Sequence, residues 1–345
     1  GGVDLKLKAA LAGQWSDPGK ADLALEGSLD AGDVNALLKL AAADRLVSAP
    51  RQPGTYTLSL KGGLAGDLRL DSRIVSANLD VRASGDVRPF TNDAGRMSLD
   101  IAVGTANLLL PGAGAKPLPV VLKTRLVSNA LGVQLNDLSA NIAGSAVRGR
   151  LGIVYGEPLA IDGELRADRI DVGAVLAAAI GSTGSAKADR LWSETPFSVP
   201  VLPEVSGRIT ISAAQANLTP SWQVSKFVTA LRFSGNDMRV DDVAGELLGG
   251  RLAGELTIRR GGDTLGLQGR IAVTDADAAQ LLFGEGAAPL TGQAALTLQL
   301  EGMGRSPRAL VGSLNGSGTL VIAHARIEAL DPKVFAAAMS RVDQG

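Results

Sequence analysis

The sequence contains no cysteine and a single histidine, His324. Without cysteine there can be no disulfide, no thiolate nucleophile and no thiolate metal site, which suits a compartment where stray thiols are oxidised. One histidine cannot form a zinc-binding pair and leaves no spare member for a histidine-based triad. The chain also lacks a Gly-x-Ser-x-Gly elbow, so we expect no enzyme activity and assign His324 a structural or surface role.

Aromatic residues are few as well, with six Phe, three Trp and two Tyr, although 46% of the chain is hydrophobic. The apolar mass is therefore Ala, Leu, Val and Ile. No apolar run approaches the roughly 18 residues of a membrane span, and the most apolar helical stretch, residues 172–180, is about half that length. We expect no membrane-spanning helix, and we expect any signal peptide or membrane anchor to lie outside this sequence.

Lys and Arg together number 34 and Asp and Glu together number 35, so the charge is balanced and gives no reason to expect nucleic acid as a partner. Three carboxylate pairs could suggest a metal or an acid–base couple: Asp30 and Asp33, Asp168 and Asp171, and Asp275 and Asp277. Each pair precedes a short apolar helical pattern, which favours helix capping. The glycine-rich residues 312–318 lack the Lys-Ser/Thr of a phosphate loop. The sequence therefore predicts neither a metal nor a cofactor.

Apolar and polar residues alternate with period two along most of the chain, as in Val3, Leu5 and Leu7, whose neighbours are charged. The pattern recurs at residues 77–84, 99–103, 252–258, 265–273 and 296–300. Because successive side chains of a strand point to opposite sides, each segment predicts a strand with one apolar side and one solvent-exposed side, as in antiparallel sheets. Helical patterns are short and few, near residues 34–41 and 172–180 and after Asp277 and Asp331.

An internal repeat organises these segments. Residues 135–153 (LNDLSANIAGSAVRGRLGI) align with residues 240–258 (VDDVAGELLGGRLAGELTI) at an offset of 105, which places Asp137 on Asp242 and Gly144 on Gly249. With one added residue the match extends into the next strand and helix, and a shorter third copy includes Gly27 and Asp33. The chain is thus predicted to be an array of strand pairs interrupted by small helices.

The composition suggests three parts. Residues 1–181 contain the drifted repeat units with the helices near 34–41 and 172–180. Residues 182–206 are rich in Gly, Ser and Pro and are predicted to be a connector or insert. Residues 207–345 form the last unit, which we expect to be truncated at its end.

Several stretches resemble one known family, the AsmA family, in its C-terminal region. They are residues 190–197 (RLWSETPF), 205–218 (VSGRITISAAQANL), 241–256 (DDVAGELLGGRLAGEL), 290–302 (LTGQAALTLQLEG), 314–322 (LNGSGTLVI) and 327–331 (IEALD). The similarity is fairly specific from about residue 157 to the end and looser before it. Two departures are Ala325 and Ala329, near which the family places glycines, and the missing N-terminal membrane helix.

The resemblance implies a bridge-like lipid-transport protein of the Gram-negative envelope, with a taco-shaped β-groove that is anchored in the inner membrane and reaches through the periplasm. Its implied partners are phospholipid acyl chains, an inner-membrane anchor outside this sequence, and envelope proteins at the two ends. From the residues themselves we expect a mainly β fold, an elongated, curled antiparallel sheet with short inserted helices. If such a sheet curls into a trough, its apolar wall can line a slot for acyl chains.

Strand parity selects a set of candidate groove-lining residues in the last unit: Leu252, Leu256, Ile258, Leu265, Leu267, Ile271, Val273, Leu296, Leu298 and Leu300. Parity alone leaves open which sheet face is concave. An alternative also stays open at this point. The chain could be a structural β-scaffold or assembly factor of the envelope, with a core filled by its own side chains and no lipid cargo.

Overall fold

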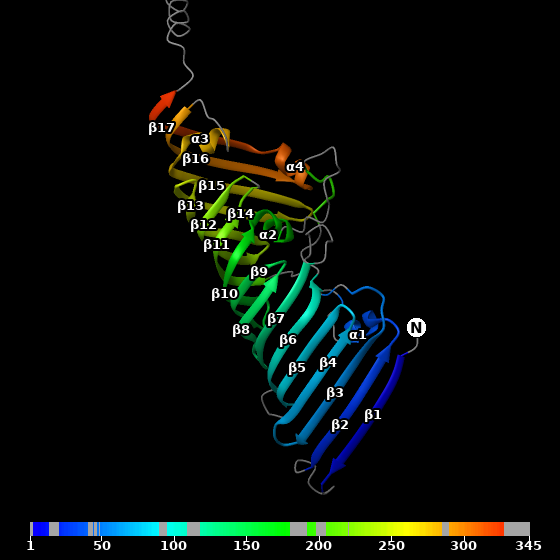
Figure 1. Cartoon of the computed structure of the whole chain (residues 1–345). Coiled ribbons are helices and arrows are strands. Elements are labelled where there is room, and N and C mark those ends of the chain that lie inside the picture. Colours follow the sequence, from blue (N-terminus) through cyan, green and yellow to red (C-terminus); the bar gives the residue numbers. More distant parts are fainter. Residues whose placement is uncertain are drawn as a thin grey trace, which may run out of the picture.

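A computed structural model describes residues 3–13, 21–40, 44, 47, 49–89, 95–108, 118–179, 192–197, 205–219, 221–284 and 290–327. These residues form one sheet of 17 strands and four short helices (Figure 1). The helices are α1 (Val34–Leu40), α2 (Val172–Ala179), α3 (Ala278–Phe283) and α4 (Pro307–Gly312). The fold is therefore mainly β, as the alternating sequence predicts.

The strands of the first part are β1 (Val3–Ala12), β2 (Asp22–Ala31), β3 (Gly54–Gly63), β4 (Leu68–Ser76), β5 (Leu79–Arg88), β6 (Arg96–Leu108), β7 (Leu118–Asn129), β8 (Gly132–Ile142), β9 (Ser145–Val154) and β10 (Leu159–Asp171). Those of the second part are β11 (Val205–Asn217), β12 (Gln223–Gly235), β13 (Asp237–Leu247), β14 (Gly250–Gly261), β15 (Thr264–Asp277), β16 (Leu290–Gly304) and β17 (Asn315–Ile327).

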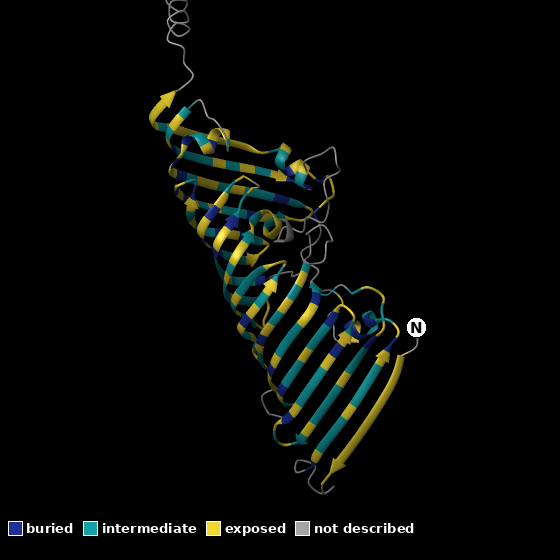
Figure 2. Ribbon diagram, viewed as in Figure 1, coloured by how far each residue is buried: buried dark blue, intermediate teal, exposed yellow. Residues whose placement is uncertain are grey.

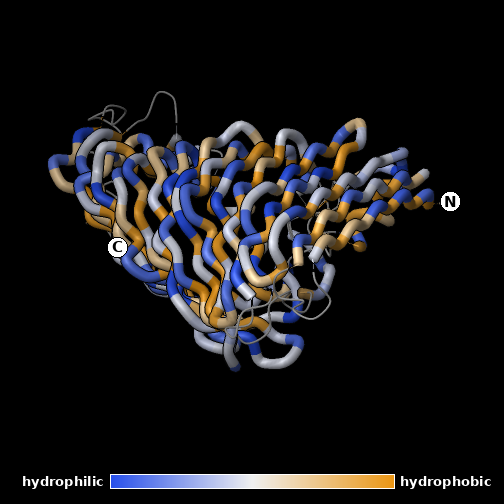
Figure 3. The backbone as a smooth tube through the Cα atoms, turned by 90° about the horizontal axis from the view of Figure 1, so that it is seen from below, coloured by the Kyte–Doolittle hydropathy of each residue, from blue (hydrophilic) through white to orange (hydrophobic). Residues whose placement is uncertain are grey.

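Each strand pairs with the strand that follows it in the chain, so the sheet grows in sequence order from β1 to β17. The result is one long, open, curled sheet. Strand direction changes progressively from β1 to β17 (Figure 1), and seen from below the backbone has a wedge-shaped outline (Figure 3). Hydrophilic and hydrophobic segments alternate along the strands in that view.

One pair departs from the expected antiparallel arrangement. β10 and β11 run parallel, with Leu159 opposite Val205 and Asp171 opposite Asn217. Parallel neighbours need a crossover connection, and here the chain between them contains α2 and residues 180–204. The predicted connector, residues 182–206, thus joins two adjacent strands of one sheet. The division into three parts at this point stays a prediction.

The internal repeat is present in the backbone. β8 and β13 begin and end at positions that differ by 105, and so do the starts of β9 and β14. In each copy an aspartate, Asp137 or Asp242, has a positive φ, at 52° and 55°. Each copy also turns through a two-residue hairpin with positive φ at both positions, which is typical of type I′ turns.

The aspartates mark β-bulges that keep the two walls in phase. The register shifts between Leu135 and Leu138, and again between Val240 and Val243. A bulge adds one unpaired residue, so the apolar side chains that follow it stay on the wall that they would otherwise leave. Aspartate tolerates the left-handed backbone at such a residue better than most side chains do.

Three of the predicted helices lie where expected: α1 and α2 within the predicted ranges, and α3 directly after Asp277. The helix predicted after Asp331 lies outside the described residues. α4 was not predicted. Its sequence signal is Ser306 followed by Pro307, where the Ser306 hydroxyl caps the helix by accepting from the Ala309 N–H at 3.2 Å.

Candidate functional site: a continuous apolar sheet face

One side of the sheet, here called the apolar face, carries the candidate lining residues. Directly opposite residues of an antiparallel pair point to the same side. Leu252 lies opposite Val273, and Val273 opposite Leu296; Ile271 lies opposite Leu298. The same registers place the remaining members on that side: Leu256, Ile258, Leu265, Leu267 and Leu300. The structure therefore brings all ten predicted residues onto one face, and their role in lipid binding stays a prediction.

The apolar face continues through the rest of the sheet. At the parallel junction Leu165 of β10 pairs with Ile211 of β11, and at the other end Leu29 of β2 pairs with both Leu5 and Tyr56. Among the described residues no second sheet packs on this face, because every strand belongs to the single sheet. The apolar walls of all the strands therefore form one surface.

Helices close this face at both strand ends in the second part. At one end α3 sits on the sheet, where Ala278 and Leu281 pack with Ala294 and Trp222. At the other end Leu310 of α4 packs with Phe197, Ile258 and Leu265. α4 can approach this closely because a Cβ on Gly304 would overlap the backbone of Ala309 and Leu310. Each end thus has its own small core.

Segment 192–197 and α2 belong to these cores. The Phe197 N–H donates to the Arg305 carbonyl at 3.0 Å, and the Arg308 N–H donates to the Ser193 carbonyl at 3.0 Å. Val172 of α2 packs against a further buried cluster, which includes Leu252 and Val273, and Leu176 packs against the cluster at the α4 end. α2 therefore lies on the apolar face between these two clusters.

Between the two cores lies a strip that the described helices leave open. Ile271, Leu298 and Leu300 appear in none of the buried clusters of the described residues, and Ile271 is 41% exposed. Glycines in this strip leave room for leucine side chains of the neighbouring strands. A Cβ on Gly269 would lie 3.1 Å from Cδ1 of Leu256, and one on Gly318 would lie 3.2 Å from Cδ1 of Leu298. Leucine side chains thus spread over glycines of the next strand and give a smooth aliphatic surface.

A hollow in the first part was missed by the sequence reasoning. It measures about 450 Å³ and lies between α1 and strands β1 to β5. Its lining is Leu5, Leu7, Gly27, Ser28, Leu29, Leu37, Leu40, Tyr56, Leu58, Ser72, Ile74, Val81 and Ala83. The signal was the same alternation, visible at residues 3–8 and 77–84.

The opposite face of the sheet is charged. Cross-strand ion pairs include Arg88 with Asp67 at 2.7 Å, Arg125 with Asp100 at 3.0 Å and Lys226 with Glu246 at 2.7 Å. The hydrogen bond from Arg88 lowers the pKa of the Asp67 carboxyl below its usual value. A hollow of about 590 Å³ on this face is lined by polar and charged side chains, such as Glu255, Gln268 and Arg270. The two faces thus separate charge from hydrocarbon, except at one strand end, where Arg260 lies opposite Leu265.

The helix-capping prediction is confirmed for the second carboxylate of each pair. Oδ1 of Asp33, Asp171 and Asp277 accepts from a helical N–H at 3.0, 2.8 and 3.0 Å respectively. The capping prediction is wrong for Asp30 and Asp275, whose carboxylates bind side chains on neighbouring strands instead. Asp30 accepts from the Thr55 hydroxyl at 2.7 Å, and Asp275 sits in a bulge and pairs with Arg251 at 3.0 Å.

The single histidine lies on the surface of the sheet. His324 is exposed on β17 with φ of 54°. No cluster of three or more metal-ligating side chains occurs within the described part of the chain. None of the helices in the described ranges is long and apolar enough to cross a bilayer.

No family model matches this chain, and no match was found among curated proteins or solved structures. The similarity to the AsmA family therefore rests on the sequence stretches alone.

Proposed function

We propose that this chain shields phospholipid acyl chains on its apolar face and so forms a non-enzymatic segment of a lipid-transport path in the bacterial envelope. The observation that carries the proposal is the continuous apolar face, which runs from β1 to β17 with no second sheet covering it among the described residues. Large apolar surfaces that a protein leaves exposed mark sites of interaction with apolar partners.

The chemistry of the face suits hydrocarbon chains. Each buried methylene contributes about 0.8 kcal/mol, so a chain of about 16 carbons gains on the order of 12 kcal/mol when it leaves water. Leucines that lie over glycines, as at Gly269 and Gly318, offer van der Waals contacts that have no preferred direction. An acyl chain can therefore slide along them. The charged opposite face keeps the segment hydrated, which is consistent with a position in the periplasm between inner and outer membrane.

Lipid extraction and native mass spectrometry of purified protein test the proposal. We expect phospholipid to co-purify with the wild type and to be lost in a triple variant with Leu256→Glu, Leu267→Glu and Leu298→Glu. The three carboxylates, one on the open strip at Leu298 and two beside the cluster at the α4 end, remove apolar surface and make burial of an acyl chain costly.

A matched control places the same charges on the opposite face of the same three strands. Thr257→Glu lies opposite Arg239, Thr274→Glu opposite Arg251, and Gln299→Glu opposite Arg270. This control should retain the lipid. If the wild type carries no lipid, or if the apolar-face variant retains it, the envelope scaffold without lipid cargo is the better account.

A further inference from the structure

The hollow beneath α1 differs from the open strip because a helix roofs it. Asp33 caps α1, and the Val34 N–H donates to the Gln52 carbonyl at 2.8 Å. Val34 is fully buried against Gly54, where an added Cβ would lie 2.8 Å from its Cγ2. The start of the helix is thus held on the sheet, while Leu40 at its other end is 75% exposed.

The sheet residues that line the hollow include small ones, whose side chains do not fill the space. The register aligns Leu7, Gly27, Leu58, Ser72 and Ala83 as one row across β1 to β5. Glycine, serine and alanine in that row leave space beside the buried cluster to which Leu37 belongs, and Leu37 borders that space. A space of about 450 Å³ lies within the roughly 300–1,000 Å³ range of small-molecule sites.

The lining defines the ligand by its chemistry. None of the described side chains that line the hollow is charged, so neither a headgroup phosphate nor an ammonium finds a partner inside. The hydroxyls of Tyr56 and Ser72 lie 3.4 Å apart and hydrogen-bond to each other, which leaves the aliphatic side chains to make most of the contacts. These features favour a hydrocarbon chain over a polar or charged ligand.

The hollow is also apolar on its β1 side. Leu5 and Leu7 are 61% and 58% exposed on edge strand β1, which is exposed along its whole length (Figure 2).

We propose that this hollow is a fixed binding site for one acyl chain of a phospholipid, in contrast to the open strip, along which chains can slide. The site rests on the function proposed above and adds a place where a lipid is held at the β1 end of the sheet.

Photolabelling tests the site. The probe is phosphatidylethanolamine with a diazirine in one acyl chain, added to the delipidated protein, and the labelled positions are mapped by peptide mass spectrometry. We expect saturable labelling of α1 and β1 to β5 that unlabelled phosphatidylethanolamine displaces. Labelling over β14 to β16 should be weaker and should not saturate in the same range.

Two variants probe the hollow separately from the strip. Ser72→Leu combined with Ala83→Leu fills the floor and should reduce labelling there by about tenfold, because the new side chains displace methylenes of the ligand. Ser84→Leu, on the opposite face of β5, should leave it unchanged. If the filled variant does not fold, Leu40→Asp places a charge at the exposed end of the roof and should have the same effect on labelling.

The outcomes separate this site from the wider function. Saturable labelling of the strip alone, or unchanged labelling in both hollow variants, overturns the fixed site and leaves the proposed lipid transport standing. Absence of labelling anywhere on the apolar face overturns both. Labelling by a diazirine analogue of free palmitate but not by the phospholipid overturns the assignment to phospholipid.

Discussion

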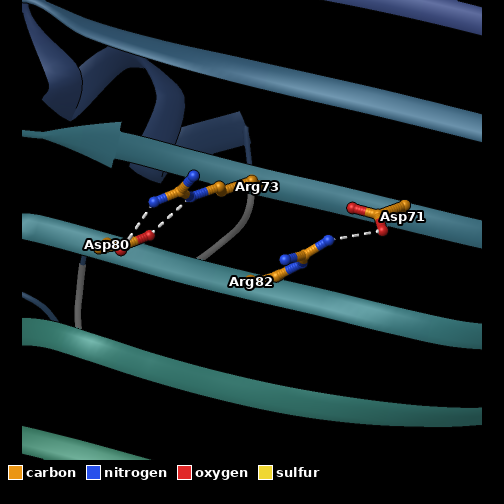
Figure 4. A network of polar contacts seen from close by, with 4 residues as sticks. All are labelled: Asp71, Arg73, Asp80 and Arg82. Atoms are coloured by element: carbon orange, nitrogen blue, oxygen red, sulfur yellow. Dashed lines mark hydrogen bonds and ion pairs between the residues drawn. The ribbon is translucent and has the colours of Figure 1, made fainter.

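Arg73 of β4 and Arg82 of β5 lie directly opposite each other, yet their guanidinium groups pair with different carboxylates (Figure 4). Arg73 donates two hydrogen bonds to Asp80, both of 2.9 Å, and Arg82 donates to Asp71 at 3.0 Å. Like charges directly opposite in a sheet repel, and the two diagonal carboxylates offset this repulsion. The charged face is thus built from diagonal as well as directly opposite pairs.

This arrangement predicts a small, salt-dependent stabilisation. Asp71→Asn combined with Asp80→Asn leaves the two arginines facing each other without counter-charges, and we expect unfolding to become easier by about 1 kcal/mol or less at low salt. The loss should shrink at about 1 M salt because exposed charges are screened. Urea unfolding at the two salt concentrations measures it, and a loss that is unaffected by salt would contradict an electrostatic origin.

The same pairs predict the direction of a pH effect. The hydrogen bonds from Arg73 lower the pKa of the Asp80 carboxyl below 3.8, its usual value. A lowered pKa in the folded state contributes stability that is present above the unfolded value and is lost as the pH falls through the folded one. The stability difference between wild type and Asp80→Asn should therefore be constant from about pH 8 to 5 and decline below about pH 4. A difference that widens in acid would be the opposite result.

The helix caps provide a third prediction. Removing the carboxylate in Asp277→Ala leaves a helical N–H without its acceptor and should destabilise the local structure by about 1 kcal/mol. Arg251→Ala, in contrast, removes a surface ion pair with Asp275 and leaves the cap in place, so it should cost less. Hydrogen exchange of the Gln280 amide measures the cap directly, and equal protection in Asp277→Ala would show that the cap is dispensable.

The sequence predicts the sheet well because its side-chain period is two. Leu265, Leu267, Ile271 and Val273 follow that period through β15, and the register places them with their partners on one face. The alternating pattern does not reveal where a bulge inserts an extra residue. Asp275 was therefore predicted to belong to a capping pair, although it lies in the bulge that keeps Ala276 on the apolar face.

Features that depend on distant parts of the chain were not predictable. The hollow needs α1 to lie over five strands, and no local pattern shows which strands a seven-residue helix covers. The parallel pairing of β10 and β11 depends on a crossover of more than 30 residues between Asp171 and Val205. An alternating pattern is the same for a strand with a parallel or an antiparallel neighbour when only one face is apolar.

The parallel junction is where a single glycine should matter most. Gly207 of β11 lies opposite Ile161 and has φ of 128°, which side chains rarely adopt. A Cβ there would overlap the backbone carbonyl of Ile161, so Gly207→Ala must both strain the chain and push β10 and β11 apart. We expect a destabilisation of about 2–4 kcal/mol.

Gly261→Ala is the matched control, since no atom lies within 4 Å of its added Cβ and its φ is not positive. Both variants remove a glycine from a strand and thus reduce the entropy of the unfolded chain in the same way. The difference between their urea midpoints therefore isolates the clash at the junction. Equal midpoints would mean that β10 and β11 do not approach each other at Gly207 as described, and the apolar face would then be interrupted between its two parts.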